Sequence, residues 1–395
     1  MAVAPFHALE PMLPSEGNHD LGDRVLDLVG KAQGLAGLLN PKVQLAVGDL
    51  VRSMNCYYSN LIEGHDTHPR DIDRALECDY SKEPRKRSLQ MEAQAHIEVQ
   101  RLIDQDAGPA VDPATCQYIL WLHKAFVERL PDEMLWAINP DTGKRIKITP
   151  GKYRDGGVSV GRHIPPGPES LDGFLARFEE VYTGKGLSKS SRIRAAAAAH
   201  HRLLWIHPFY DGNGRVARLM SYAMLRRLGV GSPIWSVARG LARSVSDYKG
   251  HLENADEPRT SDLDGRGQLS ERALIEFCRF FLDVCIDQVD YMAALLQPAE
   301  LLNRMRVYCA EEVAAKRLPK MGFSLLREAL LAGEFERGRA AELTGYQERR
   351  ARDTLSLLLK QGLLVANGPK MPVRLGFPID VVERWFPLLY PGLKI

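Results

Sequence analysis

The chain of 395 residues has few cysteines, and none are spaced as in a metal-binding knuckle or a redox motif. Its six cysteines include no C-x-x-C pair. Cys278 and Cys285 fall seven residues apart in an apolar run with a helical pattern, which is the spacing of a buried face. We therefore expect reduced thiols in the core and no zinc site.

Long apolar runs and an excess of one charge are also lacking. No uncharged apolar stretch reaches the ~18 residues that a membrane-spanning helix needs, and the N-terminus has no basic region followed by an apolar core. The formal net charge is +2, so no strong overall field attracts nucleic acid or a membrane surface. These absences predict a soluble, cytoplasmic protein with no membrane partner.

Reactive side chains are densest between Ile206 and Met220, in the segment I-H-P-F-Y-D-G-N-G-R-V-A-R-L-M. Apolar, helix-like runs on both sides indicate a loop between two helices. Gly212 and Gly214 allow the backbone around Asn213 to turn tightly. The N-terminus of the second helix then offers unpaired N–H groups to an anion, and a phosphate is the expected ligand.

The side chains of this loop fit phosphate chemistry. Asp211 is a hard oxygen ligand suited to Mg²⁺, which usually keeps several waters and bridges substrate phosphates. Arg215 and Arg218 lie three residues apart in the first turn of the second helix and can fork onto phosphate oxygens, and Asn213 can donate to another. His207, with an ordinary pKa of ~6.5, can take a proton from an attacking hydroxyl. Together these residues predict phosphoryl or nucleotidyl transfer.

The residues from His207 to Arg218 match the pattern H-P-F-x-D/E-G-N-G-R-x-x-R without departure, and in this the chain resembles Fic domain proteins. The resemblance implies transfer of AMP from ATP to a Ser, Thr or Tyr hydroxyl of a target protein, with release of pyrophosphate. It implies that His207 is the base, that Asp211 holds Mg²⁺ and that Arg218 reaches the γ-phosphate. The remaining positions of the motif would cradle the phosphates: Gly212, Asn213, Gly214 and Arg215.

Gly214 bears on the reaction type. In the related Doc proteins a lysine at this position accompanies a reversed nucleotide and plain phosphate transfer. The glycine in this chain therefore favours AMP transfer by resemblance.

A second motif, S-N-L-I-E-G, ends an amphipathic run that begins at Leu45. Ser59 and Glu63 are four residues apart and project from one face of the expected helix, and Gly64 is a natural helix stop. The motif resembles the inhibitory S/T-x-x-x-E-G/N motif of many Fic proteins. The resemblance implies that Glu63 binds Arg218 and displaces the γ-phosphate, which inhibits the enzyme. The alternative is that Glu63 merely ends a surface helix.

A softer motif covers residues 151–161, G-K-Y-R-D-G-G-V-S-V-G, which is similar to the flap above the active site of Fic proteins. The β-prone residues Val158, Ser159 and Val160 lie between glycines and predict a hairpin. An exposed hairpin edge can bind an extended target segment by main-chain pairing. An ordinary surface hairpin is the alternative.

Tyr248 lies in S-D-Y-K-G-H-L, which resembles an element that lines the adenine pocket of Fic proteins. Lys249 replaces the second tyrosine of that element, and Asp256 replaces a frequent asparagine. Tyr248 either stacks on adenine or belongs to the core.

The overall pattern predicts a mainly α protein, with a Fic-type helical core and a β-hairpin flap followed by a small winged-helix (helix-turn-helix) domain. We expect an N-terminal helical region with the inhibitory helix over residues 1–110, the catalytic core over 111–300 and the winged-helix-like domain over 315–395. The candidate helices before residue 300 are 45–63, 88–103, 113–129, 171–182, 191–205, 216–228 and 273–296.

The winged-helix expectation rests on the order of short elements near the C-terminus. These are helices at 323–331, 337–344 and 348–361, followed by two possible strands within 362–377. Arg349, Arg350 and Arg352 begin the third helix, where a recognition helix would meet DNA. The same fold also serves as a protein-interaction or dimerisation module. The apolar tail 385–390 packs either on the domain or against a second subunit.

The leading hypothesis from the sequence is a self-inhibited protein adenylyltransferase that uses ATP and Mg²⁺, modifies a protein target and itself, and forms a homodimer. One rival is another reaction at the same site, either removal of AMP with Glu63 orienting water or transfer from another nucleotide. A second rival is a DNA-binding regulator for which the nucleotide is a signal.

Overall fold

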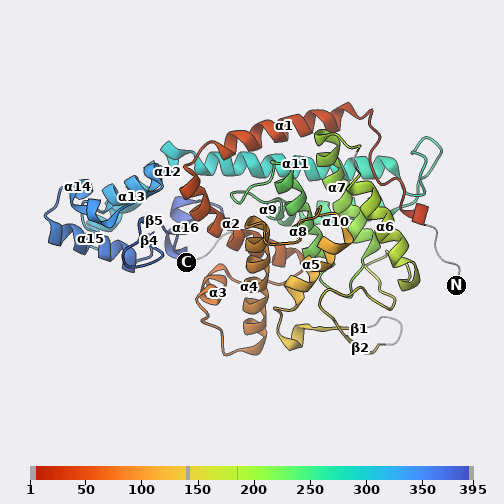
Figure 1. Ribbon diagram of the computed structural model, residues 1–395, viewed down its shortest axis with the longest axis horizontal. Coiled ribbons are helices and arrows are strands. Elements are labelled where there is room, and N and C mark those ends of the chain that lie inside the picture. Colours follow the sequence, from red (N-terminus) through yellow and green to blue (C-terminus); the bar gives the residue numbers. More distant parts are fainter. Residues whose placement is uncertain (1–5, 139–142, 185, 391–395) are drawn as a thin grey trace. The chain divides into compact units, whose positions relative to one another are not determined.

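The structure is a computed structural model that describes residues 6–138, 143–184 and 186–390 (Figure 1). Contacts divide the chain into two compact units. The first unit consists of Asn55–Ser232 and Ser236–Gln288 with the N-terminal segment up to Ala32, and the second of Gln33–Met54, Pro233–Trp235 and the chain from Val289 onward. Residues before and after position 110 thus belong to the same unit.

The first unit is built almost entirely of helices, as the sequence predicted. Three helices, α1 (His19–Ala36), α2 (Pro41–Ile62) and α11 (Glu271–Leu296), contribute residues to both units. The helices that lie wholly in the first unit are α3 (Pro69–Leu76), α4 (Pro84–Asp104), α5 (Cys116–Val127), α6 (Leu171–Tyr182), α7 (Lys189–Ile206), α8 (Asn213–Arg227), α9 (Ala238–Arg243) and α10 (Val245–Asp256), with short 3₁₀ turns η1 (Phe6–Leu9), η2 (Asp132–Met134) and η3 (Pro168–Ser170).

Helices α7 and α8 form the centre of this unit and pack against each other, with α6 on α7 and α5 on α8. The alanines at 195–199 of α7 are all buried, and their small side chains allow neighbouring helices to approach closely. The hydroxyl of Ser188 caps α7 by accepting from the N–H of Ser191. The connection between α7 and α8 is the predicted reactive loop.

The predicted helices agree with the observed ones to within a few residues, and 171–182 coincides with α6. Helix α2 begins four residues before the expected start at Leu45, since Pro41 is favoured in the first turn of a helix. Helices α1, α3, α9 and α10 were not predicted.

The structure corrects the prediction of a hairpin at Val158–Val160. Within the described residues this segment forms only an isolated bridge between Val160 and His163, and the two-stranded sheet lies upstream, where β1 (Trp136–Ile138) pairs antiparallel with β2 (Arg145–Lys147). On either side of this bridge the carbonyls of Gly156 and Pro166 accept from the guanidinium of Arg154, and the N–H of Arg154 donates to the carbonyl of Pro208.

The second unit continues after α11 with another run of short elements. They are α12 (Pro298–Ala314), α13 (Gly322–Ala332), β3 (Glu334–Phe335), η4 (Arg337–Arg339), α14 (Ala340–Thr344), α15 (Glu348–Lys360), β4 (Leu364–Val365), β5 (Val373–Leu375) and α16 (Ile379–Trp385). The strands form an antiparallel sheet in the order β3-β5-β4. Three helices and a hairpin therefore follow in the predicted order, with the two-residue β3 added.

The apolar tail packs within the second unit, which is the first of the two alternatives for it. Trp385, Phe386, Leu389 and Tyr390 are all buried. The ring of Trp385 lies edge-on to Tyr308 and Phe377. The tail is therefore part of the core of this unit.

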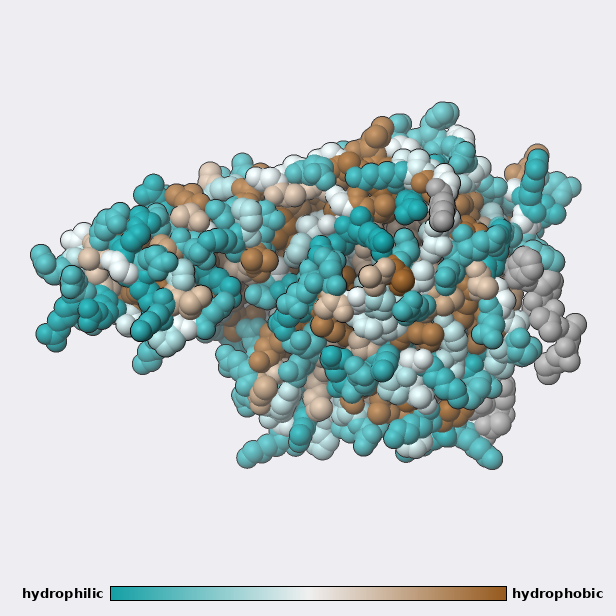
Figure 2. All heavy atoms as spheres, in the orientation of Figure 1, coloured by the Kyte–Doolittle hydropathy of each residue, from teal (hydrophilic) through white to brown (hydrophobic). Residues whose placement is uncertain are grey.

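No helix in the described ranges is both long and apolar enough to cross a membrane. On the face drawn in Figure 2, hydrophobic residues are dispersed among hydrophilic ones.

Replacing Trp385 with alanine should destabilise the second unit, because the indole is 0% exposed and its removal leaves a cavity. We expect a loss of about 3–5 kcal/mol, measured as a lower midpoint in denaturant unfolding. Leu388→Ala is the matched control, since Leu388 is exposed in the same tail and should change little. Equal midpoints for the two variants would contradict the packing described here.

Candidate active site

His207 ends α7 in a left-handed backbone conformation, with φ 48° and ψ 62°. This conformation costs energy for a residue with a side chain, and such residues are often found at functional sites. The main-chain N–H of His207 still donates to the carbonyl of Leu203 at 3.0 Å. The loop therefore leaves the helix abruptly at the residue that carries the imidazole.

The imidazole of His207 is oriented by a hydrogen bond to the chain. Its Nδ1 lies 3.3 Å from the carbonyl oxygen of Leu204, so Nδ1 carries the proton and Nε2 keeps its lone pair. Burial lowers the pKa of His207 to about 4, although the hydrogen bond to Leu204 opposes this. The ring is therefore neutral at neutral pH, as a base must be.

Asn213 and Phe209 close the loop. The Asn213 amide accepts from the N–H of Phe209 at 3.0 Å and donates to its carbonyl at 2.9 Å. The Phe209 ring stacks on His123 at 3.8 Å between centroids. Both groups of the Asn213 amide are thus engaged within the loop, whereas the sequence led us to expect a phosphate donor.

The two glycines of the loop have different tasks. Gly212 has φ +84° and precedes the first residue of α8, so it makes the turn that starts the helix. A Cβ on Gly214 would lie 2.3 Å from Oε1 of Glu63. Gly214 therefore provides the space in which the Glu63 carboxylate approaches the start of α8.

Asp211 is the acidic residue of the loop, and 55% of its side chain is exposed. Its Oδ1 accepts from the N–H of Gly212 at 2.6 Å and from Nη2 of Arg215 at 3.0 Å. Arg215 is buried over the ring of Phe126, and its other terminal nitrogen pairs with Glu92. Arg215 therefore bridges an exposed and a buried carboxylate, and burial lowers its pKa to about 10.

Arg218 is held by the end of α2. Its Nε donates to the hydroxyl of Ser59 at 2.9 Å, and its Nη2 donates to the Ser59 carbonyl at 3.1 Å and to Oε1 of Glu63 at 2.6 Å. Burial alone would raise the pKa of Glu63, but the charges of Arg218 and Arg215 outweigh it and the pKa is lowered. Glu63 is therefore ionised at neutral pH and paired with Arg218.

Residues 113–225, which include this loop, match the model of the Fic/DOC family. The chain carries a Fic domain. A segment of 82 residues is 44% identical to the protein adenylyltransferase Fic of Drosophila erecta and of Drosophila melanogaster, and covers 21% of this chain and 17% of each relative. The match thus spans about a sixth of the length of these curated relatives.

Two solved structures share the fold. A Fic family protein from Desulfovibrio desulfuricans G20 superposes with a TM-score of 0.50 at 17% identity, over 90% of this chain and 96% of that one. A Fic domain containing signaling protein from Bacteroides thetaiotaomicron gives a TM-score of 0.52 at 21% identity, over 68% and 95%. At this identity the likeness concerns the fold alone.

Tyr248 is buried in the core of the first unit. Its side chain is 2% exposed, and its hydroxyl lies 2.7 Å from Nε2 of His200. Nδ1 of His200 in turn lies 2.9 Å from the hydroxyl of Ser221. The polar end of Tyr248 is thus satisfied inside the protein, which was the second alternative from the sequence.

Arg154 is a buried residue of the Fic domain whose role the sequence did not reveal. Its Nε donates to the carbonyl of His207 at 2.8 Å, and its terminal nitrogens donate to the carbonyls of Gly156 and Pro166. A single guanidinium thus joins the flap segment to the residue that carries the imidazole. In the sequence Arg154 lies among the glycines of 151–161, and an arginine in such a segment normally indicates a surface charge.

Glu92 was also missed. It lies on α4 at four-residue spacing from Ser88, His96 and Gln100, and all four are buried. A polar stripe with this spacing normally indicates the solvated face of a helix. In the first unit the stripe faces inward and supplies a carboxylate to Arg215.

The Arg154→Lys variant should lose the planar guanidinium that donates to the carbonyls of His207, Gly156 and Pro166. Each hydrogen bond from a charged donor contributes about 1.5–3 kcal/mol, so we expect at least a tenfold fall in any activity of the site, together with a lower melting temperature. Lys152→Ala is the control, because Lys152 is exposed and pairs with Asp155 at the surface. An activity loss as large in Lys152→Ala would contradict the role of Arg154.

The pH dependence of catalysis follows from the buried imidazole. His207 accepts a proton only when neutral, and its pKa is about 4. In a variant without Glu63 the pKa falls further, because Glu63 raises it. We expect the rate to change less than about twofold between pH 8 and pH 6 and to fall only as pH approaches 4, whereas a free histidine would give a midpoint near 6.5. A rate profile with its midpoint near 6.5 would contradict the buried, neutral histidine.

Proposed function

We propose that this protein is a protein adenylyltransferase that transfers AMP from ATP to a Ser, Thr or Tyr hydroxyl of a target protein, and that Glu63 inhibits it. The observation that carries the proposal is the contact of Glu63 with Arg218 at 2.6 Å, beside a loop with the complete motif from His207 to Arg218. The space left by Gly214, where the Doc type has a lysine, supports transfer of AMP.

In the proposed reaction Nε2 of His207 takes the proton of the target hydroxyl. The hydroxyl oxygen forms a bond to the α-phosphorus of ATP as the bond from that phosphorus to the bridging oxygen breaks, and pyrophosphate leaves. The unpaired N–H groups at the start of α8, freed by the turn at Gly212, support the phosphates, which carry most of the charge. Little else is required of the protein beyond positioning.

Asp211 fits a role as the protein ligand of Mg²⁺. Both of its hydrogen bonds fall on Oδ1, and its side chain is half exposed. A single half-exposed carboxylate fits Mg²⁺, which usually takes one or two carboxylates and completes its shell with phosphates and water. When bound, Mg²⁺ would neutralise phosphate charge and stabilise the leaving pyrophosphate.

The proposed inhibition has two physical components. Ser59 and Glu63 accept hydrogen bonds from Nε and Nη2 of Arg218, so a γ-phosphate must displace them to bind this guanidinium. The ionised Glu63 carboxylate also repels a phosphate. Each ~1.4 kcal/mol of bias toward the closed arrangement lowers activity tenfold. A hydrogen bond to a charged group contributes about 1.5–3 kcal/mol, so the contact of Nη2 of Arg218 with Oε1 of Glu63 can supply at least one such factor.

The flap is proposed to receive the target. Val160 is 41% exposed and Ile164 is 81% exposed, in a segment that Arg154 ties to His207. An extended peptide that pairs with the main chain here would bring its hydroxyl near the imidazole without requiring one sequence.

The test is incubation with labelled ATP and Mg²⁺, with and without cell extract, followed by measurement of label on the protein itself and on other bands. Glu63→Gly should raise labelling at least tenfold over the wild type, because Arg218 is released, and a further His207→Ala substitution should abolish it. Glu77→Gly is the matched control, since Glu77 is an exposed carboxylate that ends α3.

Parallel incubations with the other nucleoside triphosphates test the choice of ATP. If Glu63→Gly transfers no label from any nucleotide, the proposed transferase activity is wrong. If it labels from another nucleotide more strongly than from ATP, the activity holds but AMP transfer does not.

A further inference from the structure

The turn that ends α2 is connected to the active-site loop by a second route besides Arg218, which runs through Glu92 of α4. Nδ1 of His65 lies 2.7 Å from Oε2 of Glu92. The other oxygen of Glu92 pairs with Nη1 of Arg215, and Nη2 of Arg215 binds Asp211 at 3.0 Å. A continuous chain of four side chains therefore runs from the inhibitory segment to the proposed Mg²⁺ ligand.

The two middle members of this series of side chains, Glu92 and Arg215, are buried, and the two end members are partly exposed. Glu92 is 0% exposed and Arg215 is 3% exposed, whereas the His65 side chain is 34% exposed. Removing one partner of a buried ion pair leaves the other charge uncompensated, so Arg215 depends on Glu92 for its position. Arg215 in turn holds one oxygen of Asp211, and its position affects how Asp211 is presented.

Glu63 and His65 belong to one hydrogen-bonded turn. The N–H groups of Glu63 and His65 both donate to the carbonyl of Asn60, at 3.0 and 2.9 Å, and Gly64 has φ +80°. This turn ends α2 in the manner of a helix C-terminal cap. If the turn moves, Glu63 leaves Arg218 and His65 leaves Glu92 together.

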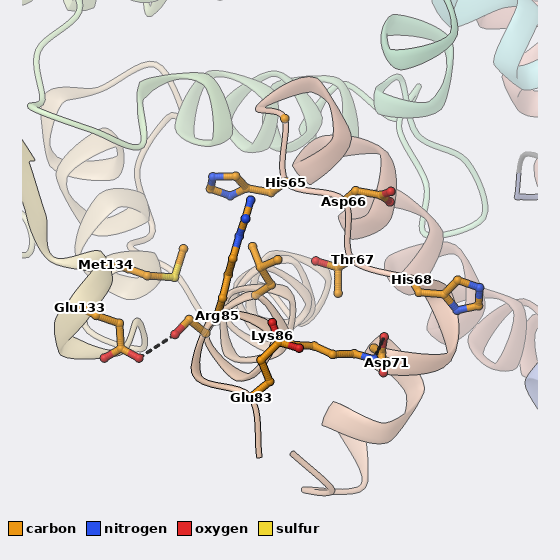
Figure 3. Close-up of a pocket in the computed structure, with 13 residues that line it drawn as sticks. His65, Asp66, Thr67, His68, Asp71, Glu83, Arg85, Lys86, Glu133 and Met134 are labelled. Carbon is orange, nitrogen blue, oxygen red and sulfur yellow. Dashed lines mark hydrogen bonds and ion pairs between the residues drawn. The ribbon is translucent and has the colours of Figure 1, made fainter. Parts of the chain in front are cut away.

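The outer end of the chain opens into a cavity of about 670 Å³ whose lining includes His65, Thr67 and Arg85 (Figure 3). The imidazole of His65 lies at one end of it, close to the extended side chain of Arg85 in this view. Burial lowers the pKa of His65, which keeps the ring neutral at neutral pH, so that Nδ1–H donates to Glu92. The contact is a hydrogen bond to a buried carboxylate at a site that solvent reaches.

We propose that Glu92 is a positioning residue of the active-site loop and that its bond to His65 is a second inhibitory contact. Glu92 holds Arg215, and through it Asp211, in the arrangement that binds Mg²⁺ and ATP. His65 anchors the turn that carries Glu63 to this same carboxylate. This inference rests on the proposed function, since it assigns two further residues to the regulation of that site.

The role of Glu92 is tested in the Glu63→Gly background, where the transferase is active. Glu92→Gln keeps the size of the side chain but cannot accept from both Arg215 and His65. We expect at least a tenfold fall in the labelling rate and a weaker binding of a non-hydrolysable ATP analogue with Mg²⁺, measured by calorimetry. Glu92→Asp keeps the charge and should partly restore both values.

The readouts separate positioning from a purely structural role. If Glu92→Gln lowers only the melting temperature, and the folded protein keeps its affinity for the analogue and its labelling rate, Glu92 does not position the loop.

The role of His65 is tested in the wild-type background, where Glu63 is present. His65→Phe removes the bond to Glu92 but keeps a ring, so basal labelling should rise by about threefold to tenfold, less than in Glu63→Gly. In the Glu63→Gly background the same substitution should change nothing, because inhibition is already lost. His68→Asn is the matched control, since His68 lines the same cavity but its ring caps α3 by accepting from the N–H of Arg70.

The outcomes distinguish this inference from the proposed function. No labelling by Glu63→Gly with any nucleotide overturns the function itself. Strong labelling by Glu63→Gly, together with unchanged basal labelling in His65→Phe, overturns the second inhibitory contact alone.

Discussion

The contacts between the end of α2 and the arginines of the active-site loop depend on the turn that ends α2. Residues 60–65 form a compact cap in which Gly64 supplies the positive φ, and the cap points Glu63 at Arg218 and His65 at Glu92. Both arginines of the loop are therefore tied, directly or through one carboxylate, to a single short segment. A change in that segment can alter the phosphate site without any change in the loop itself.

Hydrogen bonds that do not involve this turn hold the shape of the loop. The amide of Asn213 bonds to the main chain of Phe209, and the guanidinium of Arg154 donates to the carbonyls of His207 and Pro166. These bonds satisfy buried main-chain groups that would otherwise have no partner. The shape of the loop and the proposed inhibition thus rest on different residues.

Much of this site follows from residue spacing. A histidine, an acid, two glycines and two arginines between two helical runs indicate a phosphate loop, and a serine and a glutamate four residues apart indicate one helix face. The structure has Glu63 against Arg218, as the resemblance to the inhibitory motif implied. Glu92 could not be found in the same way, because a polar stripe along a helix indicates a solvated face unless the tertiary packing is known.

The errors in the predicted strands have a similar cause. Val158-Ser159-Val160 has the alternation of a strand, but Val160 forms an isolated bridge with His163, and Arg154 binds the carbonyls of Gly156 and Pro166 on either side of it, a contact that only the fold reveals. The hairpin of β1 and β2 has only three residues in each strand, too few for a pattern to be recognised. Tyr248 was undecided for the same reason, since only the fold places His200 beside its hydroxyl.

The most direct measurement is the position of the γ-phosphate in crystals of the wild type and of Glu63→Gly, each with a non-hydrolysable ATP analogue and Mg²⁺. The closed site described here predicts that the γ-phosphate contacts Arg218 only in Glu63→Gly, and that Glu63 keeps this contact in the wild type. A γ-phosphate bound to Arg218 in the same pose in both crystals would contradict the central claim that Glu63 holds the site closed.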